Sequence, residues 1–144
     1  MSNIELLNKS RTYEVMDLWL RTTTHSNSFV ENNFWEKYYD VIKDKYIEEK
    51  DVYIYTEGDK VIAFTCVNDA NMIAGLFVDP EYQNKGIGTE MIEFLKLKYP
   101  ILHIKTYALN RKALAFASKA GFIIDGAERH EHNNEVMYTM LWSR

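Results

Sequence analysis

One stretch, residues 72–99, restricts the fold of this chain more than any other part of the sequence. It begins with an apolar run, residues 72–78, which is typical of a buried strand. Pro80 follows Asp79 and ends the run, because proline has no N–H to donate to a sheet. Residues 83–89, with the sequence QNKGIGT, then lead into a segment whose apolar residues recur at helical spacing. The stretch is therefore predicted to be a strand, a glycine-containing turn and a helix.

This turn is suited to an anion. The first turn of a helix presents N–H groups without intrahelical partners, at the positive end of the helix dipole. Gly86 and Gly88 carry no Cβ that would keep a phosphate from the backbone, and Lys85 adds a positive charge. The P-loop and the dinucleotide-binding fingerprint are excluded, because Gly88 is followed by Thr-Glu and position 91 is methionine. A phosphate-binding turn is the hypothesis, and a glycine turn without a ligand is its alternative.

Two motifs in this chain resemble those of one family. The pattern QxxGxG at residues 83–88, after a strand that ends in Val-Asp-Pro, is similar to the acyl-CoA pyrophosphate loop of the GNAT superfamily of N-acetyltransferases. The pattern NxxAxxF followed by Gly-Phe, at residues 110–122, has the spacing that this family uses. The resemblance covers essentially the whole chain. It implies an α/β fold with a mixed six- to seven-stranded sheet and helices on both faces, in which strands 72–78 and 102–107 splay apart.

Length and composition agree with one globular domain over residues 1–144, which the resemblance makes a single N-acetyltransferase domain. No apolar run is long enough to span a bilayer, the N-terminus lacks an apolar signal core, and Cys66 is the one cysteine. A cytoplasmic protein without a membrane partner is expected. The net charge of −4 argues against nucleic-acid binding. Residues 83–119 nevertheless carry seven Lys and Arg residues against two acidic ones, which suits a polyanionic cofactor.

The remaining elements are predicted from periodicity and capping residues. Ser10 is the expected N-cap of a first helix, residues 22–28 are expected to form a loop, and residues 29–48 a second helix with an aromatic face. The other predicted helices are 86–98 and 111–120. The predicted strands are 4–7, 52–56, 61–67, 72–78, 102–107, 122–124 and 136–142, and residues 125–135 are expected to be a loop.

The resemblance implies acetyl-CoA as the cofactor. Main-chain groups of Phe77 and Val78 would pair with its pantetheine arm, Asn110 would contact the arm and Phe116 would pack against it. Asn110 has a simpler alternative role as the N-cap of the next helix. The backbone N–H groups of one run would hold the pyrophosphate, namely those of Gln83, Asn84, Lys85, Gly86, Ile87, Gly88 and Thr89.

Three catalytic groups are predicted. The Val78 N–H is expected to polarise the thioester oxygen. Many members of the family place a glutamate on the strand that matches residues 72–78, but this chain has none there, so the base is sought at His25, at Glu31 or through water. The tyrosine that donates to the departing sulfur in the family is replaced by Ala117. The candidate substitutes are Tyr107, Ser118 and Tyr138, and Tyr107 is the one predicted to be catalytic. No metal site is predicted, and His130 and His132 are expected to face solvent.

Four residues, Thr22, His25, Phe29 and Trp35, are predicted to line an acceptor pocket; the alternative is that the aromatic face of helix 29–48 is core. The predicted function is transfer of an acetyl group from acetyl-CoA to a primary amine by direct attack in a ternary complex. A small-molecule amine or an amino acid is the favoured acceptor and a protein lysine the alternative, with a monomer or homodimer as the working form. The alternative function is an acyl-CoA-binding regulatory module with weak or no catalysis, suggested by Ala117 and the missing glutamate.

Overall fold

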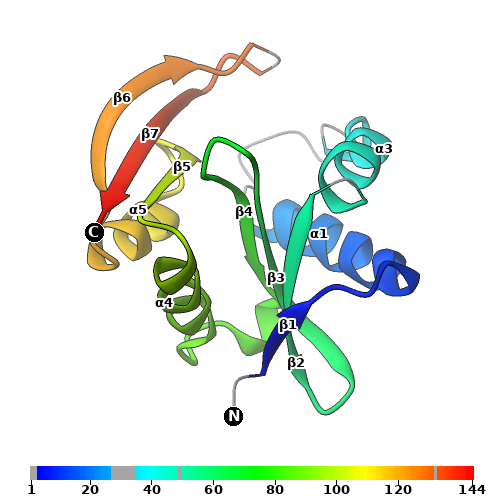
Figure 1. Ribbon diagram of the computed structural model, residues 1–144. Helices are drawn as coiled ribbons and strands as arrows, with labels where there is room; N and C mark the ends of the chain where they lie inside the picture. Colours follow the sequence, from blue (N-terminus) through cyan, green and yellow to red (C-terminus); the bar gives the residue numbers. More distant parts are fainter. Residues whose placement is uncertain (1–2, 27–34, 49, 132) are drawn as a thin grey trace.

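A seven-stranded mixed sheet forms the centre of the computed structural model, which describes residues 3–26, 35–48, 50–131 and 133–144 (Figure 1). The strands lie in the order β1-β2-β3-β4-β5-β7-β6. Neighbouring strands are antiparallel except β4 and β5, which are parallel, so the predicted mixed sheet is confirmed. The strands are β1 (Ile4–Leu6), β2 (Asp51–Glu57), β3 (Lys60–Val67), β4 (Met72–Val78), β5 (Ile101–Tyr107), β6 (Ile123–Arg129) and β7 (Val136–Ser143).

Helices cover both faces of the sheet, as predicted (Figure 1). One face carries α1 (Thr12–Ser26), the short α3 (Tyr39–Ile42) and a π-helical segment η2 (Lys43–Ile47). The other carries α4 (Ile87–Lys98) and α5 (Arg111–Lys119). Two 3-10 turns, η1 (Lys9–Arg11) and η3 (Pro80–Tyr82), precede α1 and follow β4. None of the helices in the described ranges is long and apolar enough to cross a membrane.

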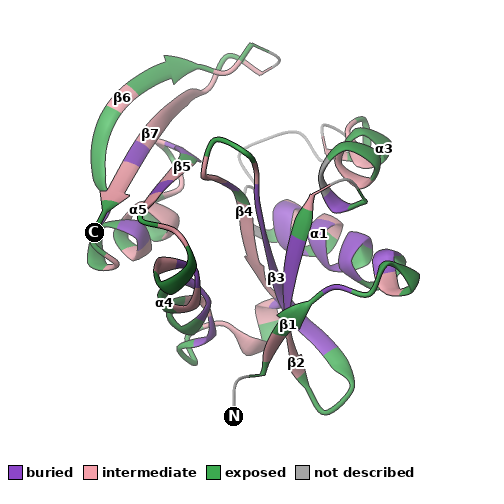
Figure 2. Ribbon diagram, in the orientation of Figure 1, coloured by how far each residue is buried: buried purple, intermediate pink, exposed green. Residues whose placement is uncertain are grey.

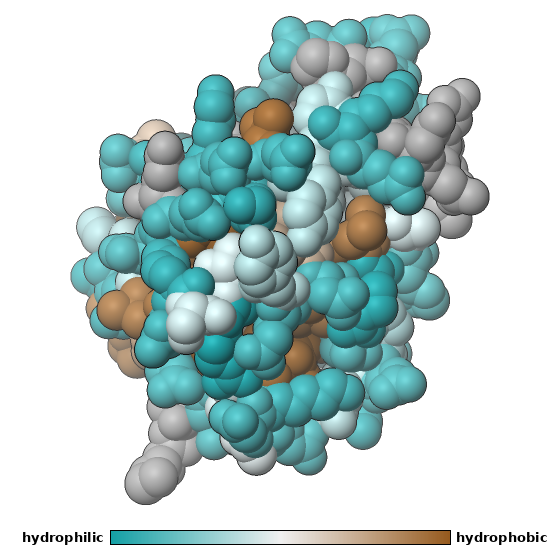
Figure 3. Space-filling model, turned by 90° about the vertical axis from the view of Figure 1, so that its right-hand side faces the viewer, coloured by the Kyte–Doolittle hydropathy of each residue, from teal (hydrophilic) through white to brown (hydrophobic). Residues whose placement is uncertain are grey.

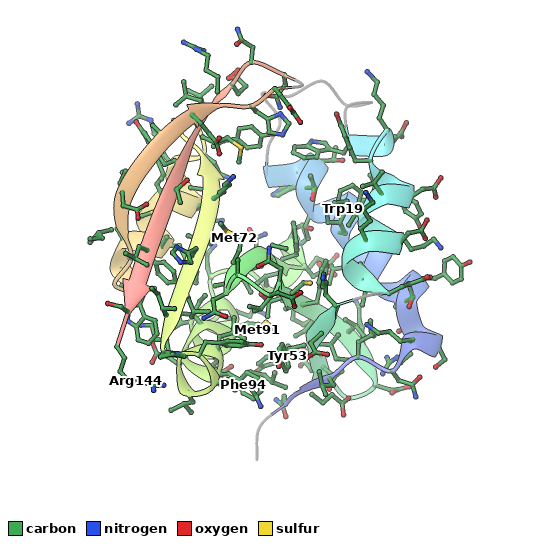
Figure 4. The ribbon with its side chains drawn as sticks, turned by 45° about the horizontal axis from the view of Figure 1, so that its top comes forward. Trp19, Tyr53, Met72, Met91, Phe94 and Arg144 are labelled. Atoms are coloured by element: carbon green, nitrogen blue, oxygen red, sulfur yellow. The ribbon has the colours of Figure 1, made fainter. Side chains whose placement is uncertain are left out.

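The core is divided by the sheet into two layers, because β2 and β3 bury side chains on both of their faces (Figure 2). Trp19 of α1 packs in one layer with residues of β2 and β3 such as Ile54 and Phe64. Tyr53 of β2 points to the other layer, where its ring meets that of Phe94 of α4 at 5.3 Å (Figure 4). Full burial of such a side chain contributes roughly 1.5–3 kcal/mol. Alternating residues of β2 therefore anchor helices on opposite faces.

The face of the molecule on the side of α1 and α3 is mostly hydrophilic in its described part (Figure 3). Its apolar residues form small, separate patches. Several apolar residues of α1 are turned inward, as the burial of Val15, Met16 and Leu18 shows, whereas Tyr13 of α1 and Val41 of α3 are exposed. The packing of α1 against the sheet therefore accounts for most of its apolar side chains.

The parallel contact between β4 and β5 is short. The two strands pair only at Met72 with His103 and at Ile73 with Ile104. Beyond these pairs they diverge, while β5 continues to pair with β7 along its whole length. The predicted splay is therefore confirmed. β4 was predicted to be buried, but only Ile73 of this strand is buried, because the strand loses its neighbour on one side.

The first helix differs from its prediction at both ends. Ser10 does not cap it but lies inside η1, the 3-10 turn that leads into α1, and Asn8 caps η1 by accepting a hydrogen bond from the Ser10 N–H. The predicted loop at residues 22–28 is wrong over residues 22–26, which are the last turns of α1. Thr22 is buried and its Oγ1 donates to the Leu18 carbonyl at 2.7 Å, a bond that lets a threonine fit inside a helix. The helix was therefore not predicted here, because buried threonines replace the apolar residues that would show helical spacing.

Two other predicted segments differ from the structure. The helix predicted at residues 29–48 falls partly outside the described residues, and its described part is interrupted: residues 35–36 are helical, residues 37–38 form a turn, and α3 and η2 follow. The predicted loop at residues 125–135 is wrong over 125–129, which belong to β6. β6 is an edge strand whose side chains are almost all exposed, so it shows no apolar alternation. Only its pairing with β7 defines it as a strand.

A buried carboxylate ties α1 to the end of β4. Asp79 has only 2% of its side chain exposed, and its Oδ2 lies 3.2 Å from Nη1 of Arg21 on α1. Its Oδ1 accepts a hydrogen bond from the Glu81 N–H at 3.0 Å. Arg21 also pairs with the exposed Asp17 at 3.0 Å. The Arg21–Asp79 pair therefore fixes α1 against the end of β4, on one side of the gap between β4 and β5.

The first prediction concerns this pair. Arg21→Ala is expected to lower the free energy of unfolding by about 1–3 kcal/mol, because it leaves the buried Asp79 carboxylate without its cation. The control is Asp17→Ala, which removes the exposed partner of the same arginine and should cost less than about 1 kcal/mol. Chemical denaturation measures both. Equal effects of the two variants would show that the buried pair does not stabilise the fold.

Candidate active site

A cleft of about 910 Å³ passes through the molecule where β4 and β5 diverge. Its lining comes from both faces of the sheet. We call the part lined by residues 82–89 and 110–119 the cofactor end, and the part lined by α1 and residues 35–42 the acceptor end. In Figure 4 the segments that border the cleft, β5 and α1, face each other across the region above β4. The splay in the sheet therefore connects two groups of residues that the sequence keeps far apart.

The turn after β4 has the backbone that its sequence predicts. Asn84 and Gly86 adopt left-handed conformations, with φ of +64° and +84°. Gly86 is the N-cap of α4, and its carbonyl accepts from the Glu90 N–H at 3.0 Å. The N–H groups of the first helical turn, at Ile87, Gly88 and Thr89, have no intrahelical acceptor within reach. These residues line the cleft, so the positive end of the α4 dipole faces its cofactor end.

The two glycines of this turn have different structural roles. A Cβ at Gly86 would meet no atom within 4 Å, so the space in front of this residue is open for a ligand. A Cβ at Gly88 would lie 3.1 Å from the Phe116 ring of α5. Gly88 is therefore also a packing residue that lets α5 approach α4. The sequence alone assigned both glycines to the phosphate.

A bridge of two hydrogen bonds links the cofactor end to the end of β4. The Gln83 side-chain Nε2 donates to the Val78 carbonyl at 3.0 Å, and Lys112 Nζ donates to Gln83 Oε1 at 3.0 Å. Lys112 and Lys119 line the cleft, although neither was predicted as a site residue. Lys85 was predicted as a site residue, but it is not part of the cleft lining that the described residues form. Its Nζ lies 5.3 Å from the centre of the Tyr82 ring. Lysines and helical N–H groups together fit a polyanionic cofactor.

Hydrogen bonding in the β3–β4 ladder decides which main-chain groups of β4 face the cleft. The Asp79 N–H donates to the Ile62 carbonyl at 2.8 Å, and Val78 lies opposite Ala63. In an antiparallel ladder alternate residues point their N–H and C=O groups to opposite sides. The Val78 N–H and C=O therefore turn away from β3 toward the open side, whereas those of Phe77 turn toward β3. The expectation that the Phe77 main chain pairs with the pantetheine arm does not agree with this register.

Phe77 contributes its ring to the cleft instead. The ring stacks on Phe64 with a centroid distance of 4.8 Å. It lies back over Gly75, where any Cβ would come within 2.0 Å of the ring. Gly75 therefore permits the Phe77 side chain to form part of the wall between the two ends of the cleft.

The motif on α5 divides between the cleft and the core. Asn110 caps α5, because its Oδ1 accepts from the Ala113 N–H at 3.0 Å, and it also lines the cleft. Phe116 lines the cleft beside Gly88, as the sequence predicts. Ala117 is only 2% exposed and packs in the core with residues such as Met140. The position that carries a tyrosine in the family therefore faces the core in this chain.

Aromatic side chains gather at the acceptor end. The Trp35 ring lies edge-on to Trp19 at 6.5 Å and to Tyr107 at 6.2 Å. Thr22 and His25, from the last turns of α1, line the same region. Phe29 lies outside the described residues. The structure therefore brings Thr22, His25 and Trp35 together at one end of the cleft and sets Tyr107 of β5 beside them.

The Tyr107 side chain is held from the β6–β7 loop. Its Oη accepts a hydrogen bond from Asn133 Nδ2 at 2.8 Å, and its ring centre lies 6.0 Å from that of His130. Burial raises the pKa of Tyr107, so its phenol keeps its proton at neutral pH. His130 is half-buried and lines the cleft, which corrects the expectation that it faces solvent; His132 lies outside the described residues. No local pattern indicates a role for His130 or Asn133, because strand pairing alone brings their loop to Tyr107.

Comparison with known proteins gives the chain a family context. A family model described as an acetyltransferase (GNAT) domain matches residues 48–124. The peptidyl-lysine N-acetyltransferase YiaC of Escherichia coli (strain K12) is 27% identical over 134 residues, which are 93% of this chain and 92% of YiaC. The peptidyl-lysine N-acetyltransferase YjaB of Salmonella typhimurium is 24% identical over 88% of this chain and 86% of its own length.

Solved structures share the fold at lower identity. The solution structure of apo YjaB from Escherichia coli superposes with a TM-score of 0.85 at 18% identity, over 96% of this chain and 95% of YjaB. The PaiA N-acetyltransferase from Thermoplasma acidophilum, crystallised with coenzyme A, superposes with a TM-score of 0.76 at 16% identity over the whole of both chains. These likenesses concern the fold.

The second prediction tests the turn at Gly86. Gly86→Asp places a negative charge in the open space before α4, where it would repel a pyrophosphate, so acetyl-CoA should bind roughly tenfold or more weakly. Gly86→Asn is the matched control, since asparagine has the same size and tolerates a positive φ without adding charge. Isothermal titration calorimetry measures both affinities. Equal affinities of the two folded variants would contradict a phosphate site at this turn.

Proposed function

Because the chain belongs to the GNAT acetyltransferase family, we propose that it acetylates the side-chain amine of a lysine residue in a protein or peptide. The chain is an acetyl-CoA-dependent N-acetyltransferase. The observation that carries the proposal is the cleft, whose two ends meet where β4 and β5 diverge. The acceptor class is supported by the relatives YiaC and YjaB, which are peptidyl-lysine N-acetyltransferases and match most of this chain. This acceptor replaces the small-molecule amine that the sequence alone favoured.

The acceptor end supports an unbranched alkylamine. The faces and edges of Trp19, Trp35 and Tyr38 offer an apolar wall for the methylene stem of a lysine. The described part of the cleft lining carries no carboxylate that would hold the amine as an ammonium ion. A lysine amine has an ordinary pKa near 10.4 and must lose a proton before it attacks. A wall without carboxylates favours that loss.

The reaction needs a hydrogen-bond donor to the thioester oxygen and another to the departing sulfur. A main-chain N–H and one phenol can provide them. Acetyl-CoA supplies the acetyl group as a thioester. The Val78 N–H, which turns to the open side of β4, is the donor we assign to the thioester oxygen, and a preorganised donor of this kind contributes about 2.7–4 kcal/mol in acyl transfer. Tyr107 donates a hydrogen bond to the departing sulfur. A phenol that stays protonated at neutral pH suits this role.

Two imidazoles flank the acceptor end and are the candidates for taking the amine proton. His25 lies on the last turn of α1, and His130 lies beside Tyr107 in the β6–β7 loop; both line the cleft. An imidazole changes charge near neutral pH, which suits a general base. Cys66 supports direct attack rather than an acetyl-enzyme, since it is buried in the core and burial raises the pKa of its thiol to about 11.

The third prediction concerns Tyr107. Tyr107→Phe should lower kcat by about a hundredfold, the lower end of the range for a general acid, because a thiol with an ordinary pKa near 8.5 already leaves tolerably well. The affinity for acetyl-CoA should stay unchanged. Tyr138→Phe is the control, since Tyr138 was the other candidate phenol and lies outside the described lining of the cleft. A wild-type kcat for Tyr107→Phe would remove Tyr107 from the mechanism.

The fourth prediction identifies the acceptor. Thiol release should be faster with a lysine-containing peptide than with free amino acids or polyamines at equal concentration. Trp35→Ala should raise the KM for the peptide more than the KM for acetyl-CoA, because Trp35 lines the acceptor end. Thermal unfolding of the variant controls for lost packing against Trp19. Preference for a free amine would contradict the lysine acceptor, and equal changes in both KM values would contradict the location of the pocket.

A further inference from the structure

The loop between β6 and β7 holds an amide against the phenol of Tyr107. Asn133 Nδ2 lies 2.8 Å from Tyr107 Oη. The loop is closed by its own main chain, since the His130 N–H donates to the Glu135 carbonyl at 2.7 Å and the Asn134 N–H to the His130 carbonyl at 2.8 Å. Asn133 is therefore carried by a hydrogen-bonded turn at the end of a hairpin, and its contact with β5 crosses 26 residues of sequence.

The direction of this hydrogen bond is fixed by a second one. Asn133 Oδ1 accepts from the Glu135 N–H at 3.0 Å. A backbone N–H can only donate, so the oxygen of the amide must face Glu135 and the NH₂ group must face Tyr107. The phenolic oxygen of Tyr107 is thus the acceptor in its bond with Asn133. The proton of the phenol must then point to a different group.

We propose that Asn133 is a positioning residue that keeps the proton of Tyr107 directed at the departing thiolate. The inference rests on the role proposed above for Tyr107. Asn133 donates to the phenolic oxygen from the loop side, and Tyr107 lines the cleft, so the cleft side is where we assign the phenolic proton during the reaction. Trp35 and His130 stand beside the ring, at centroid distances of 6.2 Å and 6.0 Å, and limit its rotation. The loop, the ring and the two flanking residues together set the direction of one proton.

The electrostatics around the phenol agree with this geometry. Burial raises the pKa of Tyr107, and the charges of Glu135 and Tyr38 raise it further. The hydrogen bond from Asn133 acts in the opposite direction, because it stabilises the phenolate more than the phenol. His130 is a further titratable group beside the ring among the residues that the structure describes. Asn133 thereby makes a buried phenol a stronger hydrogen-bond donor than its surroundings alone would allow.

The test is Asn133→Asp, a substitution that keeps the size of the side chain and the acceptor for the Glu135 N–H. The new carboxylate cannot donate, so it reverses the bond and draws the Tyr107 proton toward the loop. We expect kcat to fall about tenfold, with an unchanged KM for acetyl-CoA and an unchanged melting temperature. Asn134→Asp is the matched control, because it adds the same charge to the same turn at an exposed residue whose φ of +60° aspartate tolerates. Its kcat should equal that of the wild type.

A second readout does not depend on turnover. In protein labelled with ¹³Cζ-tyrosine, the Tyr107 resonance is identified by its loss in Tyr107→Phe. At one fixed alkaline pH, Asn133→Asp should show a smaller phenolate fraction at Tyr107 than the wild type, because the donor that lowers its pKa is gone. In the wild-type background, Tyr107→Phe should also shift the side-chain amide resonance of Asn133, a measurement that needs no variant at position 133.

A double variant separates this inference from the function on which it rests. In the Tyr107→Phe background, Asn133→Asp should cause no further loss of kcat, because Asn133 acts through the phenol. Tyr107→Phe with wild-type turnover would overturn the role of Tyr107 and the inference together. If Tyr107→Phe is slow, three results would overturn the role of Asn133 alone. These are a fully active Asn133→Asp, multiplicative losses in the double variant, and an unchanged ionisation of Tyr107 in Asn133→Asp.

Discussion

The whole site depends on the loss of pairing between β4 and β5 after two residue pairs. A strand in the middle of a sheet would normally use its main-chain groups on both sides. Here the register with β3 turns the Val78 N–H toward the side from which β5 has moved away. A backbone donor in a rigid strand needs no reorganisation when negative charge develops beside it. The sheet therefore provides, through a defect in its own ladder, the type of donor that acyl transfer requires.

Polar bridges on both faces of the sheet hold the end of β4 in place. On the face of α1, Arg21 pairs with the buried Asp79 just after β4. On the other face, Gln83 joins the Val78 carbonyl to Lys112 of α5. Both bridges end within one residue of the Val78 amide. The position of that amide is consequently coupled to a helix on each side of the sheet, so that helix packing and site geometry form one arrangement.

The sequence predicted most of what depends on local patterns and little of what depends on register. The strands β2 to β5, the helices α4 and α5, the Gly86 turn and the Asn110 cap follow from periodicity and capping chemistry. The end of α1 was missed because buried threonines imitate a loop, and β6 because an exposed edge strand has no apolar alternation. The direction of the Phe77 main chain depends on the parity of its pairing with β3, which no local pattern encodes. His130 and Asn133 reach Tyr107 only through the pairing of β6 with β7.

Ala117 shows how a missing side chain and a candidate replacement can lie on different elements. The small side chain at this position packs in the core under α5, where a tyrosine would need room that close packing does not provide. Tyr107 lies at the end of β5, opposite Met137 of β7, and so is fixed by a strand ladder rather than by a helix. β5 and β4 share the two pairs from which they diverge. A phenol at the end of one strand and an amide at the end of the other are therefore spaced by the same splay that opens the cleft, which makes that splay the feature that aligns donor and acceptor groups across the site.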